Sequence, residues 1–297
     1  MSSSHTVLYF QAGLGVIANM FLPLFYIFII LSHRPKPMDL ISCQLTFIHI
    51  MMILTAGDIL LADILQSLKF GNDFKCKTTI YINRVMRGLS ICVTCLLSVF
   101  QAVTISPNNS LLAKFKHKVQ KCIIYAFFYI WSFNLLFSSR WFFYAAGFTN
   151  ESVTNQMKVS KSCFLFPMNH ILRGLMVTMA MSRDVFLVGV MLTTSAYMVI
   201  ILFRHQRQCK HLHSIRHLRA SPEKRATQTI LLLVVFFVVM YWVDFVISFT
   251  SILLGVYDPV VLTVQISMMN VYPTITPLIQ ISSDKRIINV LKYLRSK

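Results

Sequence analysis

Long apolar runs recur along this chain and are separated by short polar connections. The runs cover residues 7–31, 40–65, 76–105, 122–139, 183–203, 226–254 and 259–281. A helix needs about 20 apolar residues to cross the hydrocarbon core of a bilayer, so each run predicts one membrane-spanning helix. The apolar segment 172–180 could extend the fifth helix. The pattern predicts an all-α integral membrane protein, with residues 1–297 forming one seven-helix domain.

Composition and charge placement agree with this architecture. The chain is 56% hydrophobic and only 13% charged, whereas a soluble domain carries about 25% charged residues. Most of the 28 Lys and Arg residues lie in the connections after the first, third, fifth and seventh runs. The positive-inside rule places these connections in the cytoplasm and the N-terminus outside. The net charge of +18 therefore indicates membrane topology, and neither a nucleic-acid partner nor a cofactor is expected.

Three features of the connections refine the topology. Cys76 and Cys163 are the only cysteines in the predicted outer segments, where oxidising conditions allow a disulfide, so we expect them to pair. Asn150-Glu151-Ser152 is a glycosylation acceptor triplet in the second outer connection. After residue 283, apolar and basic positions alternate at helical spacing, which predicts a short amphipathic helix on the inner membrane surface.

Four ionisable residues fall within the predicted spans and in the outer half of the bundle: Asp58, Arg84, Arg87 and Asp244. Charges at such depth are rare and usually partnered, so these residues form either a structural ion pair, for example Arg87 with Asp244, or a ligand site. Arg84 and Arg87 are three residues apart and share a helix face. Two arginines suit an anionic ligand head, whereas Asp58 alone suits a cation.

Phe245 and Asn270 are further candidates for the same ligand cavity. Aromatic packing and interhelical hydrogen bonding are the more common roles of such residues. A histidine cluster at 205–217 raises the alternative of an integral-membrane enzyme with a cytosolic metal site. Its neighbours are almost all Lys or Arg, so no metal site is expected.

Several blocks resemble a known family. They read RVMRGLSICVTCLLSVFQAVTISP at 84–107, ASPEKRATQTILLL at 220–233, YWVDF at 241–245 and ISSDKR at 281–286. The first closely resembles the third-helix signature of vomeronasal type 1 receptors, and the match covers the whole seven-span plan. In the second helix, this chain has Leu45-Thr46-Phe47-Ile48-His49 where the family tends to carry Leu-Ala-Leu-Ala-Asn.

The resemblance implies a G protein-coupled pheromone receptor of the plasma membrane of vomeronasal sensory neurons. It also implies small-molecule ligands bound among the outer helix ends and signalling through a heterotrimeric G protein of the inhibitory class. The candidate G protein-facing residues are Ser106, Pro107, Lys114, Arg204, Arg225, Lys285 and Arg286. A bitter-taste-like chemoreceptor is the nearest alternative with the same plan, and the third-helix signature separates the two.

Overall fold

The computed structural model describes most of the chain. The described residues are 2–32, 37–56, 71–107, 116–147, 157–158, 163–165, 170–212, 222–254, 259–283 and 287–288. Some residues expected to be functional lie outside them, namely Asp58, Lys114, Asn150, Lys285 and Arg286. Most of the expected C-terminal amphipathic helix also lies outside, because only residues 287–288 of that tail are described.

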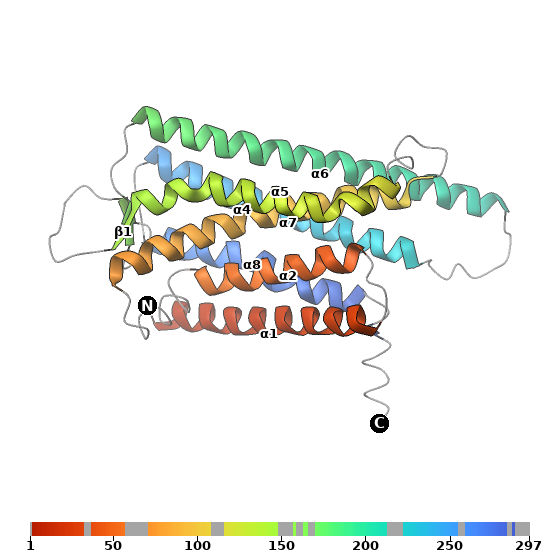
Figure 1. Ribbon diagram of the computed structural model, residues 1–297, viewed down its shortest axis with the longest axis horizontal. Helices are drawn as coiled ribbons and strands as arrows, with labels where there is room; N and C mark the ends of the chain where they lie inside the picture. Colours follow the sequence, from red (N-terminus) through yellow and green to blue (C-terminus); the bar gives the residue numbers. More distant parts are fainter. Residues whose placement is uncertain are drawn as a thin grey trace, which may run out of the picture.

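Seven long helices run back and forth along one bundle (Figure 1). They are α1 (Ser2–Ser32), α2 (Pro37–Thr55), α4 (Asn72–Ile105), α5 (Lys116–Tyr144), α6 (His170–Leu212), α7 (Pro222–Leu254) and α8 (Pro259–Ser283). The α1 helix begins at the end of the bundle where β1 lies, and α8 ends at the opposite end. The predicted seven-helix fold is confirmed.

The helices extend beyond several predicted apolar runs. In the described part of the chain, six helices are long and apolar enough to cross a membrane, and α8 interrupts its apolar sequence with Pro273 and Pro277. The fifth run was expected at 183–203, but α6 starts at His170, which confirms the extension through 172–180. Arg183 and Asp184 therefore lie inside a helix rather than at its start.

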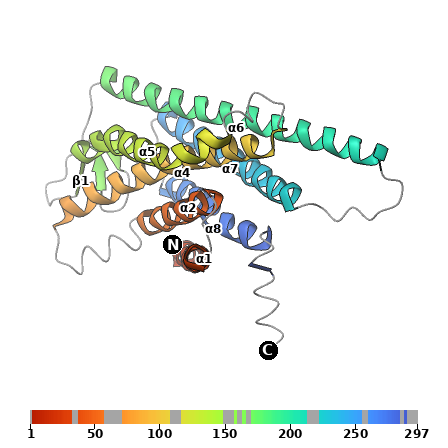
Figure 2. The ribbon, with the colours of Figure 1, turned by 45° about the vertical axis from the view of Figure 1, so that its right-hand side comes forward.

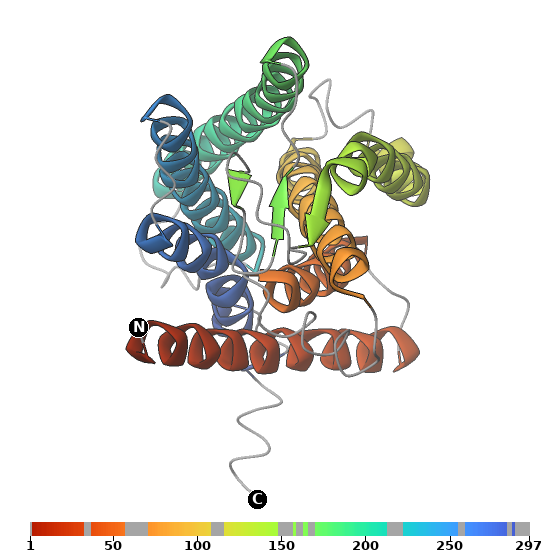
Figure 3. The same ribbon diagram turned by 90° about the vertical axis from the view of Figure 1, so that its left-hand side faces the viewer.

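The α4 helix is the centre of the bundle. Its buried residues form much of the hydrophobic core, together with side chains of α2, α6 and α7, and Figure 3 shows the other helices arranged around it. By contrast, α5 and α6 expose large apolar side chains along their outer faces, including Phe128, Leu136 and Phe186. Such faces suit lipid, which has the polarity of these side chains.

The α1 helix crosses the bundle obliquely and is seen nearly end-on in Figure 2, where α6 runs across the view. It approaches α2 and α8 closely at Gly15, where an added Cβ would lie 2.7 Å from Ile53 Cδ1 and 2.9 Å from Thr274 Oγ1. One turn further on, Asn19 donates hydrogen bonds of 2.8 Å to the carbonyl oxygens of Gly15 and Pro273. A buried amide thus joins α1 to α8.

A small antiparallel sheet covers the end of the bundle where α1 begins. Its strands are β1 (Ala145–Gly147), β2 (Met157–Lys158) and β3 (Cys163–Leu165), in the order β1-β3-β2. Gly147 pairs with Cys163 and packs so tightly on α4 that a Cβ there would lie 2.6 Å from the Asn72 carbonyl carbon. We call this the disulfide end of the bundle, because it contains the bond between Cys76 and Cys163.

Candidate functional site

Cys76 of α4 is bonded to Cys163 of β3, with a Cα–Cα distance of 5.6 Å. Both cysteines are buried in a cluster with Ile80 and Ala145, against which Trp141 and Tyr144 of α5 pack. The predicted disulfide is therefore confirmed. It fixes the segment after α5 to the first turns of α4, directly above the charged residues of the bundle.

Arg87 of α4 forms an ion pair with Asp244 of α7, as the sequence led us to expect for one of the possible pairings. The side chains are 24% and 11% exposed, so this pair is largely removed from solvent. Gln265 of α8 donates a 2.8 Å hydrogen bond to the other carboxylate oxygen of Asp244. Three helices thus meet at a single buried carboxylate.

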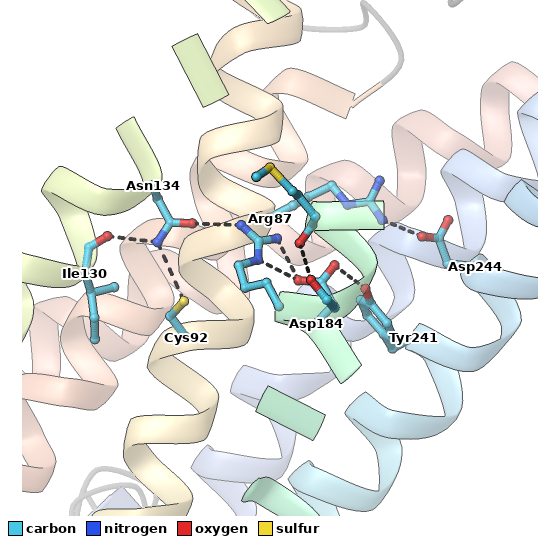
Figure 4. A network of polar contacts seen from close by, with 10 residues as sticks. Arg87, Cys92, Ile130, Asn134, Asp184, Tyr241 and Asp244 are labelled. Carbon is cyan, nitrogen blue, oxygen red and sulfur yellow. Dashed lines mark hydrogen bonds and ion pairs between the residues drawn. The ribbon is translucent and has the colours of Figure 1, made fainter. Parts of the chain in front are cut away.

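A second ion pair, not expected from the sequence, lies on α6. Arg183 contacts the adjacent Asp184 at 2.7 Å, and both side chains are mostly buried. Tyr241 of α7 donates a hydrogen bond to the other oxygen of Asp184 (Figure 4). The fifth apolar run begins at Arg183, so the hydropathy pattern predicts Arg183 and Asp184 at the start of a helix. The apolar stretch 172–180 was the signal that they lie deeper.

Asn134 of α5 extends the network toward α4 (Figure 4). Its amide nitrogen donates to the Ile130 carbonyl at 2.8 Å and to Cys92 Sγ at 3.6 Å. Its Oδ1 accepts a long 3.4 Å hydrogen bond from Arg183. Asn134 thus forms interhelical hydrogen bonds, and the network joins α4, α5, α6 and α7.

Gly88 has no side chain, and Asn134 and Arg183 occupy the space next to it. A Cβ at Gly88 would lie 2.1 Å from Asn134 Oδ1 and 3.2 Å from Arg183 Nη1. We expect Gly88→Ala to lower stability by about 1–3 kcal/mol, the usual cost of overpacking, measured as a lower unfolding midpoint of the purified protein. Adding Asn134→Ala should recover part of the loss.

Gly174 provides a matched control for that substitution. It also lies within a helix, but no atom is found within 4 Å of the position that an added Cβ would take. Gly174→Ala should leave the midpoint unchanged or raise it slightly, because alanine favours helix. Equal midpoints for the Gly88 and Gly174 variants would contradict the close-approach explanation.

Arg84 and Arg87 do not reach the same neighbours, although their positions share a helix face. The Arg84 guanidinium lies over the Trp141 ring of α5, 4.3 Å from its centroid, whereas Arg87 reaches α7. Arg140 of α5 and Arg183 of α6 both stack on Phe137, at 4.3 and 4.8 Å. The two arginines thus contact two different helices, and their shared role in binding a ligand stays a prediction.

The other expected ligand residues lie on α7 and α8. Phe245 follows Asp244 and packs edge-on against Trp242, with ring centroids 5.7 Å apart. Asn270 is buried in α8. Phe245 thus adjoins Asp244 in sequence, and the Asn270 carbonyl accepts a 2.7 Å hydrogen bond from Thr274.

Toward the end opposite the disulfide, neutral side chains connect α4 to α6 and α7. Ser98 and Thr194 are 2.7 Å apart, and Gln101 donates to Thr227 at 3.0 Å. At the last turn of α4, the Ser106 hydroxyl lies 2.9 Å from the Tyr197 hydroxyl. Of the expected G protein-facing residues, Pro107 and Arg204 are exposed, Ser106 is buried, and Arg225 belongs to α7.

Comparison with known proteins identifies similar chains. The profile of the vomeronasal organ pheromone receptor family matches residues 2–293. Vomeronasal type-1 receptor 90 of Rattus norvegicus is 39% identical over 290 residues, which cover 97% of this chain and 93% of the relative. Vomeronasal type-1 receptor 100 of the same species is 37% identical, with 99% and 90% covered. Vomeronasal type-1 receptor 48 of Mus musculus is 36% identical, with 98% and 96% covered.

Proposed function

Because this chain belongs to the vomeronasal organ pheromone receptor family, we propose that it is a plasma-membrane receptor that binds a small molecule near its disulfide end and activates a heterotrimeric G protein of the inhibitory class. The observation that carries the proposal is the buried network of ion pairs that joins α4, α6, α7 and α8. Ionisable residues held inside a membrane bundle usually mark a functional site.

The proposed orientation has the disulfide end and the N-terminus outside the cell. Two observations support it. The disulfide needs an oxidising compartment and lies at the end where α1 begins. The sequence segments that follow the first, third, fifth and seventh apolar runs carry most of the basic residues, which favour the cytoplasmic side.

A population shift is the proposed mechanism. An agonist between α4, α6, α7 and α8 would compete for Arg87 or Asp244 and contact Phe245, so it would bind one arrangement of α7 better than the other. A ligand shifts a conformational equilibrium only by the difference in its affinity for the two states. Near the opposite end of the bundle, Gln101 of α4 donates a hydrogen bond to Thr227 of α7. A movement of α7 that starts at Asp244 would therefore also change the packing of α4 against α7 at that end.

The G protein would bind the end opposite the disulfide. The proposed surface includes Ser106 and Pro107 at the end of α4, Arg204 on α6, Arg225 at the start of α7, and the connections that contain Lys114, Lys285 and Arg286. Asp58 and Asn270 remain proposed ligand contacts, and Asn150 a proposed glycosylation site. The relatives are receptors, so the membrane-enzyme alternative has no support from them.

A screen in transfected cells tests this function. Cells that express the full chain are exposed to paired compounds, each a sulfate ester and its uncharged parent alcohol, and ligand-dependent lowering of cyclic AMP is measured. We expect at least one compound to lower cyclic AMP and pertussis toxin to abolish the response. A response that survives the toxin would overturn the inhibitory-class coupling. Silence from receptor verified at the cell surface, across the whole panel, would overturn the proposed chemosensory role.

A further inference from the structure

Among the described residues near the disulfide end, two buried carboxylates face a larger number of partly exposed arginines. Two carboxylates, Asp184 and Asp244, lie among four arginines whose charges are close enough to interact: Arg84, Arg87, Arg140 and Arg183. Asp244 is engaged by Arg87, and Asp184 by Arg183. Within the described residues, Arg84 and Arg140 therefore have no ion pair, and the cluster carries two more positive than negative charges.

The contacts of these two arginines are aromatic rather than ionic. Arg84 stacks on Trp141 and Arg140 on Phe137, each with its guanidinium carbon 4.3 Å from the ring centroid. Among the described residues, the buried Nε of Arg140 has no hydrogen-bond partner. Stacking satisfies the face of a guanidinium but not its N–H groups, which lie at its edge and favour bidentate contact with oxyanions.

Phe137 strengthens the case for an anion. It has two guanidinium groups on it, those of Arg140 and Arg183. Like charges that share one ring in a low-dielectric region repel each other, and a bound anion would remove that repulsion. Only one of the two, Arg183, has a carboxylate partner in the described structure.

The position of the two arginines suits entry from outside. Arg140 is four residues, or about 6 Å, from the end of α5, and Arg84 is eight residues, or about 12 Å, along α4 from Cys76. Trp141, on which Arg84 stacks, packs against the buried cluster that contains the disulfide.

We propose that Arg84 and Arg140 form a binding site for the oxyanion head of an amphiphile, a sulfate, phosphate or carboxylate. The proposal rests on the receptor function above and names the ligand class of that site. Arg140 thus joins Arg84 at the oxyanion, whereas Arg87 is engaged by Asp244 in this structure. Arg87 and Asp244 then contact the body of the ligand or change partners when it binds.

The test uses the purified full chain in nanodiscs of uncharged phosphatidylcholine. The probes are 1-naphthyl sulfate and 1-naphthol, which share an apolar body and differ in the oxyanion. The unfolding midpoint should rise saturably with the sulfate and not with the alcohol. Arg84→Gln and Arg140→Gln should each weaken the apparent affinity about 10-fold, because each removes charge-assisted hydrogen bonds. Arg207→Gln, on an exposed arginine of α6, should leave it unchanged.

Lysine variants and a lipid arm complete the experiment. Arg84→Lys and Arg140→Lys keep the charge and should retain more of the affinity than the glutamine variants, which separates binding from folding. In nanodiscs that contain phosphatidylglycerol, a higher midpoint that depends on Arg84 and Arg140 and removes the sulfate effect would assign the oxyanion to a lipid phosphate.

Two results would overturn the oxyanion site. One is the absence of any midpoint change with either source of oxyanion. The other is an equal change with naphthol and naphthyl sulfate. If the receptor signals to uncharged compounds and the glutamine variants respond as the wild type does, the oxyanion site is wrong while the chemosensory function stands.

Discussion

Replacing either member of the Arg87–Asp244 pair with leucine is expected to remove most of the receptor from the cell surface, whereas replacing both should restore much of it. Each single change leaves one charge buried without its partner, which costs about 3–5 kcal/mol. The double change removes both charges, and an apolar pair of similar volume is often as stable as a buried ion pair. The measurement is surface labelling of an N-terminal tag, followed by the unfolding midpoint of the purified variants.

Arg207→Leu is the control for this cycle, because Arg207 is exposed on α6 and should tolerate the change. Asp244 also accepts a hydrogen bond from Gln265, so the loss in the Arg87→Leu variant should be smaller than in a site with no second donor. If the double variant is as poorly expressed as the sum of the two single variants, then Arg87 and Asp244 act independently and the pair does not stabilise the bundle.

The second large effect is expected for the disulfide. Cys76→Ser, Cys163→Ser and the double variant should each lose about 2–5 kcal/mol of stability and most surface expression, because the bond closes a loop with a sequence separation of 87. All three should be equally affected, since each removes the same bond. The measurement is the unfolding midpoint with and without a reducing agent.

Cys122→Ser is the matched control for this series. Cys122 is a free, exposed thiol of α5, so its replacement should change neither the midpoint nor its response to reduction. A wild-type receptor whose midpoint is insensitive to reduction, while Cys76→Ser is unstable, would show that the side-chain packing around Cys76 matters rather than the bond.

The helices could be predicted from hydrophobicity, and the disulfide from the side of the membrane on which each cysteine lies. Seven apolar runs predicted the seven helices, and the location of Cys76 and Cys163 in outer segments predicted the disulfide. The Arg87–Asp244 pair was also a prediction, because a charge inside a membrane bundle needs a partner. These predictions depend on the bilayer and on redox chemistry. Both act on a residue according to its position along the chain, whichever helices are its neighbours.

The arrangement around the site depends on which helices are neighbours, and hydropathy carries little of that information. Arg84 and Arg87 share a helix face, yet positions three apart differ by about 60° around a helix, and long side chains amplify the difference. One therefore reaches Trp141 of α5 and the other Asp244 of α7. Which of the two is free for a ligand could not be decided before the neighbours were known.

Gly88 shows the same limit in another way. Its need for glycine comes from Asn134 and Arg183, on two other helices, so no local pattern around residue 88 reveals it. Asp184 and Tyr241 were missed for a similar reason, since a charge at the assumed end of a span needs no explanation. Once α6 is seen to begin at His170, Asp184 requires a partner, and Tyr241 supplies it.

The bundle is fastened unequally along its length. The disulfide and the Arg87–Asp244 ion pair hold one end, whereas Ser98 with Thr194, Gln101 with Thr227, and Ser106 with Tyr197 are uncharged contacts at the other. Each such contact is worth only about 0.6 kcal/mol in a membrane protein. These uncharged contacts therefore add little to the free energy of separating α6 and α7 from α4 on that side, beyond the packing of the apolar side chains that the three helices share. The helices are therefore held most firmly at the disulfide end and less firmly at the opposite end.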